Sequence, residues 1–281
     1  MRDSFLCLLL SIYFIYKIFL FFNQLNTSLR LIFLDVGQGD SIFITTANRK
    51  VLIDGGMYYD IDQSLAKYIG SLFCHIDIIY PTHVDSDHIG GINRLLDRCD
   101  VDQVLFNEVL CSSNLCKEFY SKLPYDKVRH VVAGNYDVVD GVEFYTFWPT
   151  EEYLNKCSAI GETSGDCNIN DFSTVLLVKK GDYEALMTGD IGKSVIGKLD
   201  INDILSHIDG RLDIYKVPHH GSRNSLDVSF ISALNPEYCV ISSGSGNKFG
   251  HPHEEVIENL EKIGCQILRT DILGTIEFDV Q

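Results

Sequence analysis

The stretch that decides the fold is PTHVDSDHIGG, residues 81–91. It follows the apolar run IDIIY, typical of a buried strand, and precedes a segment whose apolar spacing predicts a helix. His83, Asp85, Asp87 and His88 therefore share one loop at the carboxyl end of a strand. Nitrogen and oxygen donors this close in sequence suit one or two divalent metal ions. The structural alternative is a polar turn in which Asp87 caps the helix.

Three later motifs also place polar residues at predicted strand ends. MTGDI (187–191) carries Asp190, KVPHHGS (216–222) carries the pair His219 and His220, and FGHPH (249–253) carries His251. A single GD would normally be a turn, but strand ends from one sheet meet at a common edge, where ligands collect. His75, His130 and His207 belong to no such motif, so we interpret them as structural.

From residue 29 onward, short β-rich runs alternate with amphipathic segments. LIFLD, SIFITT and KVLID open a first block of strands, and VEFYTF, FSTVLLV and YEALM belong to a second. Two blocks of this kind predict an α/β fold of two packed sheets with helices outside, a four-layer αβ/βα sandwich. No linker interrupts the pattern, so we predict a single domain over residues 29–281.

The N-terminus differs in composition from the rest of the chain. Residues 5–22 read FLCLLLSIYFIYKIFLFF, an apolar run broken only by Ser11 and Lys17. As a helix it would reach roughly 27 Å, close to the ~30 Å hydrocarbon core of a bilayer. We predict that residues 1–28 form an apolar helix that acts as a membrane anchor or signal segment. The absence of an A-x-A-like site favours an anchor over a cleaved signal peptide.

The net charge and the cysteines limit which partners and metal sites the sequence predicts. The formal net charge of −16 disfavours broad electrostatic capture of nucleic acid but not a metal centre, because cations need carboxylates. None of the nine cysteines forms a C-x-x-C pair, which disfavours a cysteine zinc ribbon. We expect most of them to be small buried apolar side chains. Cys111 with Cys116, and Cys157 with Cys167, would pair if the domain is exported.

THVDSDHIGG, TGD and HHGS, in this order, resemble the metal motifs of the metallo-β-lactamase fold superfamily. LDVGQGDS (34–41), LIDGG (52–56) and FGHP (249–252) narrow the resemblance to the C-terminal hydrolase domain of ComEC-type bacterial competence proteins. The resemblance covers residues 29–281. ComEC proteins also carry a channel region with many membrane spans, whereas this sequence offers one candidate span at most.

The resemblance implies a set of metal ligands. His83 and Asp85 would serve one site and Asp87 and His88 a second, with Asp190 bridging them. Either His219 or His220 would complete the second site. The superfamily usually has a further histidine before the bridging aspartate, but the matching stretch NINDFSTVLL has none. Asn170 or Asp171 would stand in for it, or the first site would be weak.

Three further aspartates match supporting positions. Asp54, in LIDGG, matches a residue that orients the ligand loop. Asp35 and Asp40 are expected to organise neighbouring strand ends. Structural roles for these three are as compatible with the pattern as direct ligation.

The implied chemistry is hydrolysis. One or two divalent ions, Zn or Mn, would generate a metal-bound hydroxide for attack on the substrate. Asp87 would orient the hydroxide, and His251 would protonate the leaving oxygen or hold a phosphate. ComEC-like relatives imply a phosphodiesterase or nuclease acting on DNA, with the catalytic domain outside the cytoplasm and the membrane contacted through residues 5–22. No protein partner is predicted.

Other functions remain open at this point. The site also fits a phosphorylcholine-type or other small-molecule phosphodiesterase, or a lactone or β-lactam hydrolase. The missing histidine in NINDFS leaves room for a metal-poor binding module. A membrane-tethered structural protein would not need the metal motifs.

Overall fold

Short apolar runs separated by glycine and polar turns form fourteen strands in the computed structural model, which describes residues 13–14, 16–17, 29–58, 61–69, 74–109, 113–160 and 167–280. They make two seven-stranded sheets. The first, in spatial order, contains β14 (Ile276–Val280), β1 (Leu29–Phe33), β2 (Ile42–Thr45), β3 (Lys50–Ile53), β4 (His75–Tyr80), β5 (Asp100–Leu105) and β6 (Val128–Arg129). The second contains β13 (Gln266–Arg269), β12 (Tyr238–Ile241), β11 (Ile214–Lys216), β10 (Tyr183–Met187), β9 (Val175–Lys180), β8 (Val142–Trp148) and β7 (Tyr136–Val139).

Both sheets follow the same plan. Each starts with antiparallel neighbours, β1 to β3 in the first and β7 to β10 in the second, and continues with parallel pairs. Parallel strands need crossover connections, which here contain helices. The last strand, β14, returns to the first sheet and pairs antiparallel with β1, from Leu29 opposite Val280 to Phe33 opposite Ile276.

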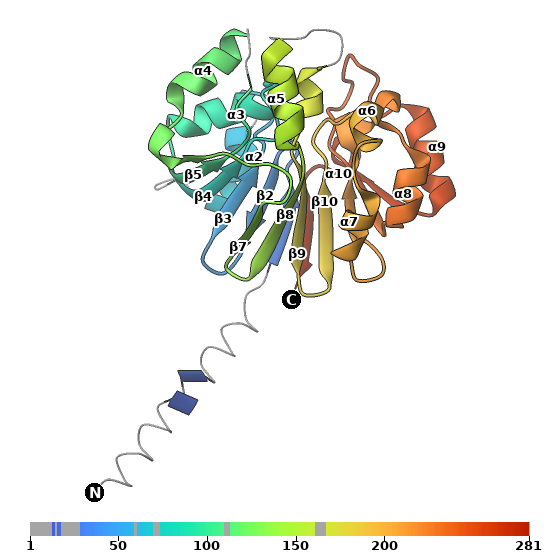
Figure 1. The fold of residues 1–281 in the computed structure, drawn as a ribbon, viewed down its shortest axis with the longest axis horizontal. Helices are drawn as coiled ribbons and strands as arrows, with labels where there is room; N and C mark the ends of the chain where they lie inside the picture. The colour runs from blue at the N-terminus through green and yellow to red at the C-terminus, as the bar shows by residue number, and fades with distance from the viewer. Residues whose placement is uncertain are drawn as a thin grey trace, which may run out of the picture.

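Helices cover the outer faces of the sheets, as Figure 1 shows with α3 and α4 on one side of the strands and α8 and α9 on the other. The first sheet carries α2 (Ile61–Ile69), α3 (Ser86–Leu96) and α4 (Asn114–Lys122). The second carries α5 (Glu151–Ile160), α6 (Lys193–Ile196), α7 (Ile201–Ser206), α8 (Val228–Leu234) and α9 (Glu254–Ile263). The remaining short helices are η1 (Tyr125–Lys127), η2 (Ile169–Phe172), η3 (Pro218–Gly221), η4 (Arg223–Ser225) and α10 (Thr270–Leu273).

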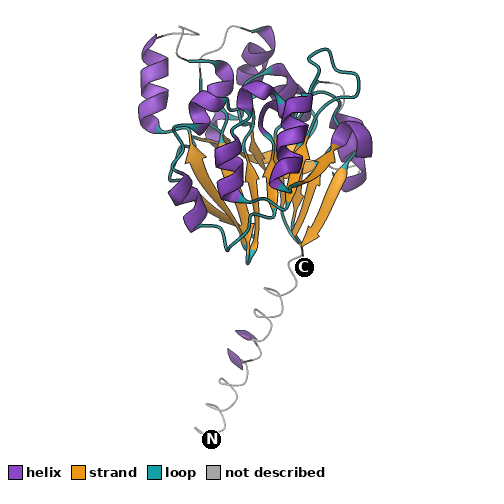
Figure 2. Cartoon of the chain, turned by 90° about the vertical axis from the view of Figure 1, so that its right-hand side faces the viewer, coloured by secondary structure: helices purple, strands orange, loops and turns teal. Residues whose placement is uncertain are grey.

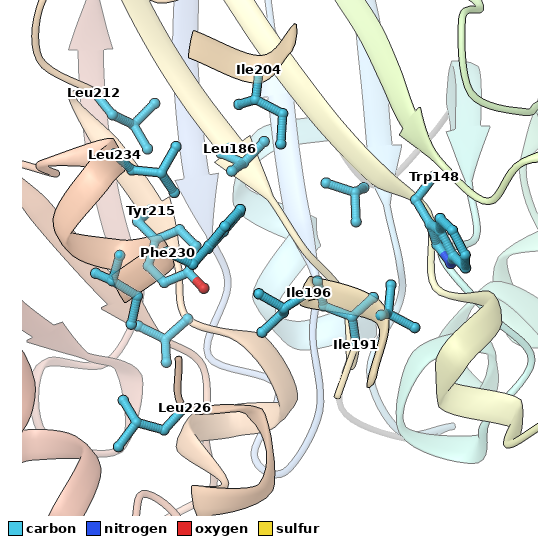
Figure 3. Close-up of a cluster of buried hydrophobic side chains, with 14 of the residues drawn as sticks. Trp148, Leu186, Ile191, Ile196, Ile204, Leu212, Tyr215, Leu226, Phe230 and Leu234 are labelled. Atoms are coloured by element: carbon cyan, nitrogen blue, oxygen red, sulfur yellow. The ribbon is translucent and has the colours of Figure 1, made fainter. Parts of the chain in front are cut away.

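Three apolar clusters hold these layers together. One lies between the sheets, where the rings of Tyr80 and Phe144 stack with centroids 5.7 Å apart. A second joins the first sheet to α2, α3 and α4. The third joins the second sheet to its helices and includes Tyr215 and Phe230 (Figure 3). Strands buried on both faces need apolar residues at every position, which explains the continuous runs of the sequence.

The predicted two-sheet sandwich with outer helices is thus confirmed, and Figure 2 shows the strands at the centre of the molecule with helices around them. Helices α5, α6 and α7 were not predicted from the sequence. Two of these helices are only four and six residues long, too short to show an apolar period.

The predicted apolar segment, residues 5–22, lies almost entirely outside the described residues. Its helical structure therefore stays a prediction. Within the ranges given above, no helix is both long and apolar enough to cross a membrane.

Three disulfides have both cysteines among the described residues: Cys74–Cys99, Cys157–Cys167 and Cys239–Cys265. The Cys157–Cys167 pair agrees with the sequence analysis. The other two pairs were not predicted, because their partners are 25 and 26 residues apart and meet only in the folded chain. Cys239 and Cys265 are buried, as expected, but they are also bonded to each other. Cys116 is also disulfide-bonded, but Cys111 lies outside the described residues, so the pairing of these two stays a prediction.

Reduction is expected to destabilise the domain. Opening a loop of about 25 residues restores chain entropy to the unfolded state worth roughly 3 kcal/mol. Urea unfolding with and without dithiothreitol measures the loss. The variant Cys239→Ala/Cys265→Ala should lose more than Cys157→Ala/Cys167→Ala, whose loop is shorter. Equal midpoints for the oxidised and reduced protein would contradict the expectation.

Candidate metal centre

The loop between β4 and α3, with the first turn of α3, places the side chains of His83 and His88 in the protein interior. Asp85 caps α3 by accepting a hydrogen bond from the Ser86 N–H at 3.3 Å, so the capping role considered for Asp87 falls to Asp85. The helix therefore begins at Ser86 and carries His88 inward in its first turn. His83 and His88 are 1% and 0% exposed.

A glycine sets the position of Asp87. The carbonyl of Asp87 accepts the N–H of Asp40 at 3.1 Å, which ties the metal loop to the LDVGQGDS stretch. A Cβ at Gly39, whose φ is +130°, would lie 2.2 Å from that carbonyl oxygen. The second glycine of GQGD is therefore required for the close approach of two backbones beside the site.

Seven side chains from both sheets meet at one edge of the sandwich. Their nitrogen and oxygen atoms form four groups whose members lie within 4.8 Å of one another: His83, His88 and Asp190; Asp87, His88 and His220; Asp40, Asp190 and His220; and Asp40, Asp54 and His88. The donors follow β3, β4, β10 and β11 or precede β2, so the two packed sheets assemble the cluster together.

Asp190 occupies the middle of this cluster. Its Oδ1 lies 3.3 Å from Nε2 of His88, and its Oδ2 lies 3.4 Å from Nε2 of His220. Nε2 of His220 is also 3.3 Å from Oδ2 of Asp87. A carboxylate whose two oxygens face different imidazoles has the arrangement required of a ligand shared by two ions.

Several buried atoms of the cluster have no hydrogen-bond partner. They are Nε2 of His83, His88 and His220, together with Oδ1 of Asp190. Buried polar atoms are rarely left unsatisfied, and here they converge. Imidazole nitrogens with carboxylate oxygens and no thiolate suit Zn or Mn, so the residues fit a divalent metal.

Charge inside the cluster is balanced by protons on histidines. Burial by itself would lower the pKa of His88, but the carboxylates of Asp190 and Asp54 outweigh it and raise that pKa well above its ordinary value. His220 behaves in the same way beside Asp190 and Asp40. A divalent cation can replace these protons, because its charge satisfies the same carboxylates.

His83 stays neutral. Burial, reinforced by the charge of His88, lowers its pKa to about 3. Its Nδ1 lies 3.1 Å from Oγ1 of Thr82 and 3.2 Å from Oγ of Ser173, so Nε2 is left free. Oγ of Ser173 also accepts the N–H of Asp190 at 3.0 Å. Ser173 is thus the residue of the NINDFS stretch that reaches the centre.

The structure does not bring Asp85 or Asp171 into the donor groups of histidines and carboxylates. Asp85 caps the helix, and Asn170 lines the neighbouring cleft. The carboxylate of Asp171 accepts hydrogen bonds from Ser194 at 3.2 Å and from Tyr153 at 3.4 Å instead. The predicted sharing of one site by His83 and Asp85 is therefore not seen; His83 groups with His88 and Asp190.

Asp54 orients His88. Its Oδ2 is 2.7 Å from Nδ1 of His88, and its own oxygens accept the N–H and the hydroxyl of Thr82 at 2.7 Å each. A carboxylate on Nδ1 selects the tautomer that leaves Nε2 available for a metal. This is the position expected of an aspartate that supports the ligand loop.

Asp40 and Lys216 form a fully buried pair behind His220. Nζ of Lys216 lies 2.7 Å from Oδ2 of Asp40, whose Oδ1 lies 3.2 Å from Nδ1 of His220. Burial would raise the pKa of Asp40, but the charges of Lys216 and His220 lower it. Lys216 was not predicted as a site residue, although a lysine inside the apolar run IYKV is a visible signal in the sequence.

The structure distinguishes the two adjacent histidines. His220 is 1% exposed and belongs to two donor groups, with Nδ1 also 3.0 Å from the carbonyl of Ser242. The side chain of His219 is 29% exposed, and its Nε2 is 3.9 Å from Asp190 Oδ2. The geometry favours His220 as the ligand, with His219 on the cleft wall.

A cleft of about 470 Å³ opens over the donors. Asp87, Asp190, His219 and His220 line it together with His251. Burial and the neighbouring histidines lower the pKa of His251 to about 4, so its ring is neutral at pH 7. Asp35 is exposed and holds the turn before Asp40 by accepting the Gly37 N–H at 3.1 Å, as expected for a residue that organises a strand end.

The sequence profile of the Metallo-beta-lactamase superfamily matches residues 34–244, the span that contains every donor described above. This chain belongs to that superfamily. Membership of this superfamily supports the prediction that the protein is a metal-dependent hydrolase. The donor groups, which lie within the matched span, are the candidate ligands of its metal ions.

Curated relatives of this metallo-beta-lactamase domain include competence proteins. The chain is 28% identical over 265 residues to ComE operon protein 3 of Bacillus subtilis, covering 87% of this chain and 32% of that protein. It is 29% identical over 249 residues to competence protein ComA of Neisseria gonorrhoeae, covering 87% and 31%. The chain spans about a third of the length of these relatives. The predicted resemblance to ComEC-type proteins is confirmed.

Solved structures show the same fold with different chemistry. Igni18, a metallo hydrolase from Ignicoccus hospitalis, aligns with a TM-score of 0.56 at 14% identity, covering 91% of this chain and 100% of that one. CmlA, a diiron β-hydroxylase from Streptomyces venezuelae, also aligns at 0.56, with 15% identity and coverage of 90% and 54%. At these identities the likeness shows the fold alone, so the reaction must be argued from the site.

Proposed function

We propose that this protein is a metal-dependent phosphodiesterase that cleaves DNA. The observation that carries the proposal is the position of Asp190, between His88 and His220 at the floor of an open cleft. The competence proteins among its relatives support DNA as the substrate.

The donor groups assign the metal ligands. His83, His88 and Asp190 would hold one ion, and Asp87 and His220 would hold a second with Asp190 shared. Divalent cations supply Lewis acidity and neutralise charge at a phosphoryl group. Zn and Mn both fit a site of imidazole and carboxylate donors.

Asp87 acts as a positioning carboxylate in this proposal. Burial opposes its ionisation, but the imidazole of His220, whose Nε2 lies 3.3 Å from Oδ2, and the charge of His88 hold its pKa well below the usual range. It therefore remains charged at neutral pH and accepts a hydrogen bond from the attacking water. A group with so low a pKa is poorly suited to removing the proton itself.

His251 contacts the substrate as a neutral ring. Because its pKa is lowered to about 4, few molecules carry the imidazolium at neutral pH. A hydrogen bond to a phosphate or leaving oxygen fits this state better than full proton donation. Its backbone N–H is held by Oδ1 of Asn247 at 3.0 Å.

We further propose that the domain works outside the cytoplasm and is held at the membrane through residues 5–22. Three disulfides support export, because cytosolic thiols are normally kept reduced. DNA or another phosphodiester is the proposed partner.

Two other functions are tested by the same assay. A small-molecule phosphodiesterase, including a phosphorylcholine-type one, would use the same donors, and so would a lactone or β-lactam hydrolase. A metal-poor binding module is disfavoured by four convergent buried atoms without partners.

Asp87→Asn is expected to lower phosphodiesterase activity by about 10²–10³-fold, the usual loss when one well-placed electrostatic group is removed. The substitution keeps the size of the side chain and removes its charge. The assay compares oligonucleotide, choline phosphodiester, lactone and β-lactam substrates with Mn or Zn, and elemental analysis gives the metal content of each protein.

The exposed Asp126→Asn is the matched control, since it makes the same chemical change in η1, outside the donor groups and the cleft lining. Near-full activity of Asp87→Asn with bound metal would contradict the assigned role. Metal binding without cleavage of any phosphodiester would overturn the proposed substrate class.

A further inference from the structure

An exposed aromatic ring stands at the mouth of the metal cleft. Phe249 is 51% exposed and lines the same cleft as Asp190 and His220. Single exposed apolar side chains are common and need no explanation. This one differs because Met57, 41% exposed, also lines the cleft. Two exposed large apolar side chains thus line the cleft over the donor cluster.

The loop that carries Phe249 is rigidly braced. The side-chain Nδ2 of Asn247 donates to the carbonyls of Gly244 at 2.9 Å and His251 at 2.5 Å. Its Oδ1 accepts the N–H groups of Phe249 at 3.1 Å and His251 at 3.0 Å. One amide thus closes the turn on both sides of Phe249. Ordering this ring on binding would cost little entropy, because the loop is already held.

The start of the loop is anchored beside the metal centre. Gly244 donates its N–H to Oε1 of Gln38 at 3.3 Å, and a Cβ at Gly244 would lie 2.6 Å from the backbone nitrogen of Gln38. Gln38 is two residues before Asp40. The position of the ring is therefore set relative to the donors and does not depend on a free surface loop.

The neighbours of the ring point to a ligand that is planar and anionic. The rings of Phe249 and His251 stack with centroids 5.7 Å apart and an interplanar angle of 22°. Nζ of Lys248 lies 5.0 Å from the centroid of Phe249. A cation beside an aromatic face suits a nucleobase next to its phosphate. A choline headgroup would be repelled by the same ammonium.

We propose that residues 244–251 form a base-stacking platform, in which Phe249 stacks on a nucleobase next to the phosphodiester and Lys248 contacts a neighbouring phosphate. This inference rests on the proposed phosphodiesterase function and adds its substrate specificity. The platform accepts unpaired bases, because a paired base is already stacked in its duplex. It also explains how a chain of net charge −16 would hold a polyanion: through a local contact.

The test compares a single-stranded oligonucleotide with one of the same length that is abasic throughout. Phe249→Ala should raise KM on the normal strand by about 5–150-fold, the range for losing one stacked base, with a small change in kcat. The abasic strand should be cleaved equally by both proteins. Phe249→Tyr should keep KM on the normal strand close to the wild-type value, since tyrosine also offers an aromatic face. Tyr125→Ala removes another exposed ring, in η1 and away from the cleft, and should change nothing.

A binding measurement separates this inference from the proposed function. Fluorescence anisotropy of labelled strands in the Asp87→Asn background reports stacking without cleavage. The platform is supported if adding Phe249→Ala weakens binding of the normal strand but not of the abasic strand, even if no phosphodiester is cleaved. An equal effect on both strands, or no effect, overturns the platform and leaves the metal site untouched. Loss of cleavage in every protein, with stacking intact, overturns only the phosphodiesterase proposal.

Discussion

Asp190→Asn is expected to abolish phosphodiesterase activity, with a loss greater than the about 10³-fold given by one electrostatic group. The reason is that both oxygens of Asp190 are engaged, one facing His88 and the other His220. The two histidines hold the pKa of Asp190 well below its usual range despite complete burial, so the wild-type group is charged. Asparagine has the same shape but one acceptor and no charge.

The same substitution is expected to remove bound metal. A ligand shared by two ions contributes to both sites, so elemental analysis should show a lower content of both ions than in the wild type. This readout does not depend on any substrate. Retention of the full metal content by Asp190→Asn would show that the carboxylate is not shared.

Asp171→Asn is the informative control. Asp171 is also a buried aspartate, but its carboxylate accepts hydrogen bonds from Ser194 and Tyr153 and lies outside the donor groups. We expect it to keep its metal. If Asp171→Asn lost metal as fully as Asp190→Asn, Asp171 would be the replacement ligand that the sequence left open.

Lys216→Met is expected to destabilise the fold by about 3–5 kcal/mol, the cost of leaving one charge of a buried pair without its partner. Lys216 is fully buried, and its ammonium contacts Asp40 at 2.7 Å and the carbonyl of Val217 at 3.0 Å. Methionine fills a similar volume without charge. Urea unfolding at neutral pH measures the loss.

The pH dependence of this loss has a definite sign. In the wild type the pKa of Asp40 is lowered, so its pairing stabilises the fold above the unfolded pKa and is lost as the pH falls through the folded one. Without Lys216, burial acts with less opposition and the pKa of Asp40 rises. Burying a protonated Asp40 costs less free energy than burying a charged one. The difference in free energy of unfolding between the wild type and Lys216→Met should therefore shrink as the pH is lowered from neutral.

A double variant completes the test. Lys216→Met/Asp40→Asn removes both charges and should recover part of the stability, because no unpaired ion remains. Equal stability of Lys216→Met and the wild type would show that the pair has no structural role. If the stability difference between Lys216→Met and the wild type grew at lower pH, the unpaired charge of Asp40 would not be its cause.

The sequence alone determined the metal loop and the class of fold. His83, Asp87 and His88 are recognisable because they lie within six residues, between a buried strand and a helix. The strands were readable because a sheet buried on both faces needs continuous apolar runs. Local patterns of this kind can be recognised in a short stretch of sequence without knowing how the rest of the chain folds.

Only the tertiary structure decided which distant residues meet. It paired β14 with β1, chose His220 over His219, and joined Cys74 to Cys99 and Cys239 to Cys265. It also moved the helix cap from Asp87 to Asp85 and brought Ser173 to His83. The physical reason is that these contacts depend on how two sheets pack, and packing is a property of the whole core that no short stretch of sequence contains.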